Sequence, residues 1–302
     1  MSHDPTPLTL EALKAARAER YRQLPHLRVT SEAEALSFLN EMGLCLLFSD
    51  RAIELPTLWG AICGRDRQVP VAHDDYELGL AWNWKDTLPV AGKVLYGKFL
   101  RRKPVFITLE LAPCFYALSP NYGDPAADYL DDYRDGRLPV ESKQVYETLL
   151  ERGALPTSRL RLDAGLGGKG NATRFDRALA DLQMDLRIVK VAISEANRWG
   201  YCYVYDLFHR HFPAVVEAAR GIGGSQARET ILLRYLQTVI AATPRQVGQL
   251  FGWQPGDVGR LVSRLAAEGK LRSGIMIEGL PGEHLAILKP VTALAEPIPA
   301  WP

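Results

Sequence analysis

Cationic and amide side chains gather at two stretches whose apolar residues recur with helical spacing. The first stretch begins near Asn171 and the second near Gly256. Arginine, lysine and asparagine can donate hydrogen bonds to phosphate oxygens and to the edges of guanine and adenine. We expect these exposed helix faces to contact a nucleic acid, although exposed helix faces are polar in any protein. The expected contacts are Lys169, Asn171, Thr173, Arg174 and Arg177 in the first stretch, and Arg260, Arg264, Lys270 and Arg272 in the second.

A third candidate surface combines aromatic and basic residues between positions 82 and 103. Six basic residues stand there against one acid, Asp86. Trp82 and Trp84 have the spacing of a strand, which would put both rings on one face, either stacked on bases or within the core. The expected nucleic-acid contacts in this stretch are Lys85, Lys98, Arg101 and Arg102.

The stretch from Phe115 to Asp135 has the opposite character. Five aspartates lie between Asp124 and Asp135 against one basic residue, Arg134. An acidic segment repels DNA, so we expect a connector that packs away from any binding face. Its carboxylates show no spacing that favours a metal site or an acid–base pair.

Whole-chain composition narrows the class of protein. Hydrophobic residues make up 47% of the 302 positions and charged residues 24%, which is typical of globular domains and excludes collagen or a disordered chain. The net charge of +1 is small for a nucleic-acid-binding protein, but the local field over the contact face matters more than the sum. No apolar run has the length of a membrane helix, and no secretory signal begins the chain, so we expect a soluble cytoplasmic protein.

The cysteines and histidines do not indicate a metal site. The four cysteines are widely spaced with no CxxC pair, and the six histidines form no HExxH motif. His209 and His211 are two apart, but they stand where a strand end enters a helix, and we interpret both as surface or packing residues. We expect buried, reduced thiols, no metal and no cofactor. The sequence leaves the oligomeric state open.

The elements that position these residues fall into an arm and three segments. Residues 1–29 form an N-terminal arm with a helix over 8–24. Segment A, residues 30–138, starts with a helix capped near Ser31 and ended by Gly43, then continues with a helix-like stretch at 90–100 and a β-rich run at 104–111. Segment A is either a divergent winged helix or another fold, and it ends in the acidic connector.

Segments B and C, residues 139–213 and 214–302, show the same order of elements. Segment B is expected to contain helices at 140–152, 155–162 and 171–182, then strands at 186–193 and 201–207. Segment C is expected to contain helices at 227–240, 243–250 and 256–268, then strands at 271–277 and 284–288. Three helices followed by a hairpin are typical of a winged helix. The predicted fold class is therefore α+β, mainly α, with tandem winged-helix domains and short β-hairpin wings.

The predicted wings supply two further contacts. Arg198 and Trp199 lie at the expected tip of the segment B hairpin. An exposed tryptophan there would stack on a base or enter a groove, or it would fold back on a neighbouring module.

Segment C resembles a known family. Residues 235–253, YLQTVIAATPRQVGQLFGW, leading into residues 265–271, LAAEGKL, resemble the last module of the AlkZ-type (YcaQ-like) tandem winged-helix family. Segments A and B are similar to its AlkZ-related subgroup, so the likeness spans most of the chain. The resemblance implies three winged helices that form a concave, DNA-sized surface, and DNA glycosylase activity on alkylated or cross-linked bases without a metal.

The same resemblance implies a catalytic motif in the first module, glutamine, an apolar residue, then glutamine or aspartate. The only match here is Gln183-Met184-Asp185, at the end of the third expected helix of segment B. A carboxylate can polarise water and an amide can orient it beside an oxocarbenium-like sugar. A polar tripeptide at a helix end is also a common cap. Gln183 and Asp185 are therefore a catalytic candidate in a different module from the family's motif.

Three functions remain as alternatives. The first is a non-enzymatic protein that binds double-stranded DNA in regulation or repair, and the sequence favours it. The second is a metal-independent DNA glycosylase. The third is a protein-interaction scaffold whose winged helices have lost contact with nucleic acid.

Overall fold

The computed structural model describes residues 9–71, 74–121, 123–196 and 200–288. The chain forms two compact units. The first, here the N/C unit, combines the described parts of Met1–Ala81 and Arg228–Ala295, and the second, the central unit, lies within Trp82–Ala227. Each unit takes residues from more than one predicted segment, so the segment boundaries stay a prediction.

The order helix, strand, helix, helix, strand, strand occurs in segments A and B. In segment A it consists of α2 (Glu32–Met42), β1 (Leu44–Leu46), α3 (Leu58–Cys63), α4 (Tyr76–Val90), β2 (Val94–Leu100) and β3 (Lys103–Thr108). In segment B it consists of α7 (Val140–Arg152), β4 (Leu155–Pro156), α8 (Thr157–Asp163), α9 (Ala172–Met184), β5 (Ile188–Ser194) and β6 (Cys202–Leu207).

Segment C follows nearly the same order. It consists of α12 (Gly224–Val239), α13 (Pro244–Phe251), α14 (Pro255–Ala267), β7 (Leu271–Met276) and β8 (Glu283–Ile287), and a single bridge between Ala242 and Leu285 replaces the first strand. The helices and hairpins predicted for segments B and C are confirmed, and so is the α+β, mainly α, class.

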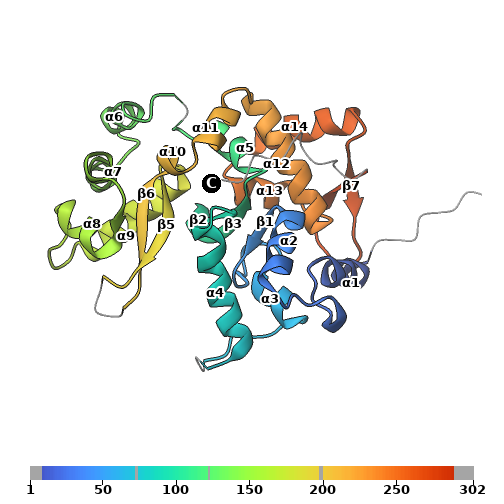
Figure 1. Ribbon diagram of the computed structural model, residues 1–302. Coiled ribbons are helices and arrows are strands. Elements are labelled where there is room, and N and C mark those ends of the chain that lie inside the picture. Colours follow the sequence, from blue (N-terminus) through green and yellow to red (C-terminus); the bar gives the residue numbers. More distant parts are fainter. Residues whose placement is uncertain (1–8, 72–73, 122, 197–199, 289–302) are drawn as a thin grey trace, which may run out of the picture. The chain divides into compact units, whose positions relative to one another are not determined.

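The core of segment B forms where α7 packs against α8 and α9, and α8 and α9 contact the β5–β6 hairpin (Figure 1). Strand β6 lies between β4 and β5 in an antiparallel sheet. On α9, Phe175, Leu179 and Leu182 are buried in this core. Their spacing of three and four residues puts them on one helix face and leaves the polar residues on the other.

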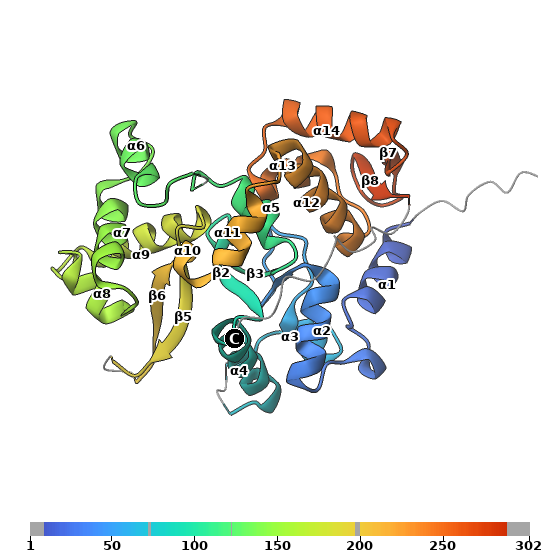
Figure 2. The same ribbon diagram turned by 45° about the horizontal axis from the view of Figure 1, so that its top comes forward.

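The core of segment C is built from α12, α13 and α14 with the β7–β8 hairpin (Figure 2). Helix α13 begins with a capping box in which Thr243 and Gln246 satisfy each other's backbone N–H groups. On α14, Val258, Leu261, Val262 and Leu265 are buried, as their spacing predicts.

The N-terminal arm docks on segment C. Its helix, α1 (Leu10–Arg20), buries Leu13 against Ala241 and Ile277. The Arg17 guanidinium donates hydrogen bonds to the backbone oxygens of Val239 (3.0 Å) and Ala241 (2.9 Å). The arm is thus part of the N/C unit.

The predicted elements between residues 76 and 100 are corrected. Helix α4 covers 76–90, where a strand-like pair of tryptophans was predicted, and β2 covers 94–100, where a helix was predicted. Pro89 lies in the last turn of α4, where it does not break the helix. Strand β2 is buried along nearly its whole length, and a short apolar run without alternation does not distinguish strand from helix.

The remaining helices of the central unit are short. They are α5 (Ala112–Ala117), α6 (Asp128–Arg134), α10 (Phe208–His211) and α11 (Pro213–Ala219), while the 3-10 turn η1 (Pro25–Leu27) belongs to the N/C unit. All four cysteines are buried free thiols, as predicted. Among the described residues, no helix is both long and apolar enough to cross a membrane.

Candidate nucleic-acid interface

The exposed face of α9 carries the cations predicted for segment B. Lys169 in the preceding loop, Thr173, Arg174 and Arg177 are exposed, and Asn171 is half-buried at the N-cap position. The Arg174 side chain is 67% exposed, and its nearest carboxylate, Glu141, is 3.7 Å away. Within the described part of the chain, Lys169 and Arg177 form no ion pair. Most of the positive charge on this face is therefore available to a ligand.

The cations predicted for α14 and its wing are held by local acids. Arg260 lies 2.5 Å from Asp257 on its own helix. Arg264 and Lys270 both bind the carboxylates of Glu229 and Glu268, at 2.5–3.0 Å. Arg272 is exposed on β7. The carboxylates offset most of the positive charge that the sequence places on this helix.

The β2–β3 turn presents the basic residues Arg101 and Arg102 on a strained backbone. Their φ angles are 51° and 57°, in a two-residue turn where Asn and Gly are the usual residues. Both side chains are exposed, but Arg102 binds Asp181 of α9 at 2.7 Å. Lys98 is half-buried on β2. Of these predicted contacts, Arg101 and Arg102 are exposed, whereas Lys98 is only partly exposed.

Lys85 does not have the exposed position predicted for a phosphate contact. Its side chain is 3% exposed, because α4 is a helix that turns Lys85 inward. Its ammonium group donates to Asp86 (2.6 Å) and to the hydroxyls of Tyr201 (2.7 Å) and Tyr203 (2.8 Å). The helix also separates the two tryptophans: Trp84 is buried, whereas Trp82 is 48% exposed.

Lys85 belongs to a larger group within the central unit that sequence analysis missed. We define the lysine–tyrosine cluster as Lys85, Asp86, Tyr96, Lys190, Tyr201 and Tyr203. The Lys190 ammonium lies 3.8 Å from the ring centroid of Tyr203 and 4.6 Å from that of Tyr96. Alternate tyrosines at 201, 203 and 205 are the signal that could have indicated it, because residues two apart share one face of a strand.

The charges of this cluster are strongly perturbed. Burial, and after it the charge of Lys85, lowers the pKa of Lys190 to about 7. Burial lowers the pKa of Lys85 as well, against the opposing effect of Asp86. Burial raises the pKa of the Tyr201 and Tyr203 hydroxyls, so both stay protonated donors at neutral pH. The lysine–tyrosine cluster therefore combines the amines of Lys85 and Lys190 with neutral tyrosine hydroxyls.

Gln183 and Asp185, the catalytic candidates, have separate surroundings. Gln183 is buried: its Oε1 accepts the Lys98 backbone N–H (3.2 Å) and its Nε2 donates to the Leu179 carbonyl (2.7 Å). The side chain thus joins α9 to β2, where a Cβ on Gly97 would come within 2.9 Å of it. Both amide ends have backbone partners and the side chain is buried, so the catalytic role of Gln183 stays a prediction.

Asp185 ends α9 beside a buried arginine. Its Oδ2 lies 4.0 Å from Nε of Arg187, and its side chain is 30% exposed. Burial, only partly offset by Arg187, raises the pKa of Asp185 to about 6. This carboxyl can gain or lose a proton near neutral pH, which is a property of a general acid or base.

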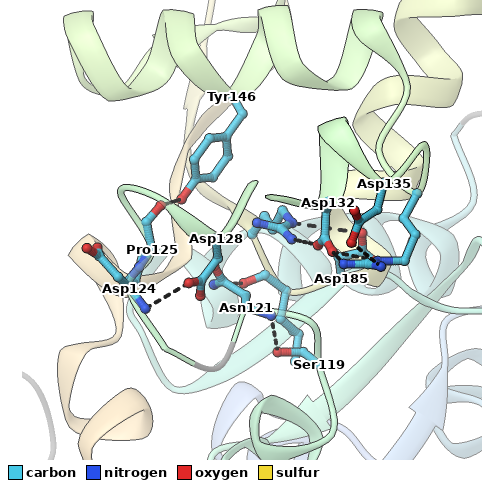
Figure 3. Close-up of polar contacts among 12 residues, drawn as sticks. Ser119, Asn121, Asp124, Pro125, Asp128, Asp132, Asp135, Tyr146 and Asp185 are labelled. Carbon is cyan, nitrogen blue, oxygen red and sulfur yellow. Dashed lines mark hydrogen bonds and ion pairs between the residues drawn. The ribbon is translucent and has the colours of Figure 1, made fainter. Parts of the chain in front are cut away.

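Arg187 is fully buried, and its main partner is Asp132 on α6. Figure 3 shows Asp132, Asp135 and Asp185 converging on the arginine side chains at this place. Asp132 and Asp135 also bind Arg137, at 2.7 Å each. The acidic connector therefore binds its own arginines and Arg187.

The neighbouring loop of the connector satisfies its own polar groups. The Asp124 backbone N–H donates to Asp128 (2.9 Å), and the Tyr146 hydroxyl donates to the carbonyl of Pro125 (2.6 Å), as Figure 3 shows. Asn121 is buried there and donates to the hydroxyl of Tyr116 (3.0 Å). The connector is a structural part of the central unit. Among the described residues no cluster of histidine, cysteine and carboxylate side chains could hold a metal ion.

Arg198 and Trp199, the predicted wing contacts of segment B, lie outside the described residues, so their roles stay a prediction.

Comparisons with known proteins agree with this architecture. A family model described as AlkZ related matches residues 29–252. Among solved structures, the chain is similar to the Streptomyces sahachiroi DNA glycosylase AlkZ, with a TM-score of 0.55 and 12% sequence identity, over 94% of this chain and 71% of that chain. At this identity the similarity shows the fold alone. No curated protein matches the chain.

Proposed function

Because the chain belongs to the AlkZ-related family, we propose that it binds double-stranded DNA, in DNA repair or in regulation. The observation that carries the proposal is the exposed face of α9, where Lys169, Arg174 and Arg177 are only weakly offset by carboxylates. This helix is the third of its segment and precedes a hairpin, and the corresponding helix of a winged-helix protein enters the major groove. Its arginines suit guanine edges and its lysine suits a phosphate.

The basic β2–β3 turn adds a second contact in the same unit. Arg101 and Arg102 adopt a backbone conformation that costs of the order of 1 kcal/mol or more per residue. Such strain is retained where the side chains are needed at that place. We propose that the turn contacts the phosphate backbone.

Salt-dependent binding tests the proposal. Anisotropy of a labelled duplex is measured from about 50 to about 200 mM salt, where each phosphate contact contributes a slope of about 0.9 in log K against log salt. Lys169→Ala/Arg174→Ala/Arg177→Ala is expected to weaken binding about 10- to 100-fold and to reduce the slope by about 2–3.

The control is Arg134→Ala, which removes an exposed arginine of the acidic connector that is paired with Asp131. Its affinity is expected to equal that of the wild type. Equal binding by the triple variant and the wild type would exclude α9 as the contact face. A wild-type protein that fails to bind duplex at low salt would favour the scaffold alternative.

Asp185 favours DNA glycosylase activity as a second candidate function. A partly exposed carboxyl with a pKa of about 6 can act on a hydrolytic water, and the similar solved structure is a DNA glycosylase. Two observations count against it: both ends of the Gln183 amide have backbone partners, and the tripeptide lies in segment B, whereas the resemblance implies a motif in the first module. Release of an alkylated base by the wild type and its loss in Asp185→Asn would establish this activity. Absence of release from a panel of lesions would eliminate it.

A further inference from the structure

Lys190 is a lysine with an unusual environment. Its ammonium nitrogen lies 3.8 Å from the ring centroid of Tyr203 and 4.6 Å from that of Tyr96, between β6 and β2. Within the described part of the chain it makes no hydrogen bond and no ion pair. The residue as a whole is half-buried. Aromatic faces attract a cation, but they supply no hydrogen bond and no counter-charge.

The nearest carboxylate is already committed to the other lysine. Asp86 accepts from Lys85 at 2.6 Å and from the Tyr201 hydroxyl at 2.9 Å. Lys85 and Lys190 share the ring of Tyr203, the first at 5.1 Å from its centroid. Other titratable groups facing Lys190 are Tyr96 and Lys98 on β2, and its register partner on β6 is Tyr205.

This arrangement activates the Lys190 amine. A partly desolvated lysine beside a second cation loses its proton more readily, and the free amine is the nucleophilic form. With a pKa of about 7, roughly half of the Lys190 side chains are neutral at neutral pH. Lys85 differs in that a carboxylate and two hydroxyls bind it, and Asp86 opposes the lowering of its pKa by burial.

We propose that Lys190 is a nucleophilic amine that forms a Schiff base with an aldehyde. Building on the proposed DNA binding, we assign the aldehyde to the ring-opened sugar of an abasic site in DNA. Such a nucleotide presents a reactive C1′ aldehyde and lacks its own base.

The surroundings of Lys190 fit that substrate. Trp82 and Tyr201 are 48% and 40% exposed, and both rings lie within about 5 Å of the Lys85 ammonium. Exposed rings can stack on the bases that flank the missing one, and a basic turn on the adjoining hairpin can hold phosphates.

The chemistry needs no further reactant. The Lys190 nitrogen lone pair forms a bond to C1′, and the carbonyl π electrons move to oxygen, which takes up a proton. The nitrogen loses a proton, and loss of water then forms the C=N bond. Amine and aldehyde give imine and water, with no net oxidation or reduction.

Borohydride trapping of the full chain tests the proposal. Borohydride reduces an imine to a stable amine, so a duplex with one abasic site becomes covalently attached, and peptide mapping identifies the lysine. The wild type is expected to give an adduct at Lys190. Lys190→Arg keeps the charge and the ring contacts but is no comparable nucleophile, and it is expected to give at least tenfold less adduct.

The control is Lys143→Arg on α7, where the lysine is paired with Glu147; its yield is expected to equal that of the wild type. Trapping should rise with pH around 7, whereas an ordinary lysine, with a pKa of about 10.4, would continue to rise well above 8. Thermal unfolding of Lys190→Arg verifies that the variant is folded.

The outcomes separate this inference from DNA binding. Normal binding of intact duplex with no adduct at Lys190 overturns the inference and leaves the proposed function standing. If intact duplex does not bind, the proposed function fails. A DNA-free aldehyde, propionaldehyde with borohydride, then tests the amine alone: selective labelling of Lys190 supports the nucleophile but overturns the abasic substrate, and unselective labelling overturns both.

Discussion

Helices α9 and α14 occupy the same place in the same order of elements, and each has 13 residues. Both bury one apolar face and expose an arginine-bearing face. On α9 the nearest carboxylate to Arg174 is 3.7 Å away, whereas on α14 Arg260 and Arg264 have carboxylates within 3.0 Å. Equal topology therefore does not give equal surface charge; the acids of neighbouring elements decide it.

The carboxylates at the C-terminal ends of the two helices also differ in how closely cations bind them. Asp185 is the C-cap of α9 and Glu268 is the C-cap of α14. Burial raises the pKa of Asp185 to about 6, whereas hydrogen bonds from Lys270 and Arg264 lower the pKa of Glu268. Segment B has its C-cap carboxylate in a partly buried position beside a buried arginine. Segment C has its C-cap carboxylate in ion pairs at the surface.

Replacing the buried Arg187 should destabilise segment B much more than segment C, and this is the largest effect that we expect. Arg187→Ala removes the buried partner of Asp132 and leaves that carboxylate only the exposed Arg137, and we expect a loss of up to about 3–5 kcal/mol in unfolding free energy. Hydrogen exchange should show the loss in α7 and α9, with α12 and α14 little changed. Arg187→Met/Asp132→Leu should recover much of it, because an apolar pair needs no counter-charge; equal loss in both variants would refute a charge-based role.

The two C-cap carboxylates should change the unfolding free energy in opposite directions as the pH rises. The pKa of Asp185 in the folded protein, about 6, exceeds its ordinary 3.8, so the native state binds the proton more tightly. Stability should fall by about 1–3 kcal/mol as pH rises from about 4 to about 6, and Asp185→Asn should remove this fall. The pKa of Glu268 is lowered, so its contribution is present above about pH 4.5 and is lost as pH falls. Urea unfolding of wild type, Asp185→Asn and Glu268→Gln across this range measures both; slopes of the same sign would contradict the assignment.

The N-terminal cap of α13, which α8 lacks, should make a smaller contribution to the unfolding free energy. Thr243 accepts the Gln246 backbone N–H at 3.1 Å, whereas α8 starts after Pro156 with no side-chain cap. Thr243→Ala should lower the unfolding free energy by about 1 kcal/mol, and Thr243→Ser should retain most of it. Thermal unfolding of both variants checks this, and an equal loss in the serine variant would assign the effect to the methyl group.

Removing a carboxylate that binds the cations of α14 should change duplex affinity only slightly, and this is the smallest effect that we expect. Glu229→Gln removes the carboxylate shared by Arg264 and Lys270, so segment C should become more like segment B in charge. If segment C contacts DNA, we expect duplex affinity to rise about threefold at low salt, which is under 1 kcal/mol. Glu217→Gln, which removes the carboxylate that binds Arg220 at the C-cap of α11, is the matched control. Unchanged affinity in both variants would indicate that α9 makes the contacts without α14.

Sequence periodicity predicted much of the architecture for a physical reason. In α9 and α14 the apolar residues recur every three to four positions, and that spacing alone decides which face is buried. The stretch 76–100 was predicted wrongly, because a strand buried on both faces lacks alternation and a proline in a last helical turn resembles a breaker. The cationic residues of α9 were found because they lie on one local helix face.

The chain's own sequence determined its helix–hairpin order, its capped helices and the polar faces of α9 and α14, all of which depend on neighbours a few residues apart. Tertiary structure alone decided which cations keep their charge available. Lys85 and Lys190 are lysines of the same type, separated by 105 positions in the sequence, and only folding brings both to the ring of Tyr203. Asp86 binds one of them, and the other is left in an aromatic site. A pKa depends on such distances and on burial, which a linear spacing does not contain.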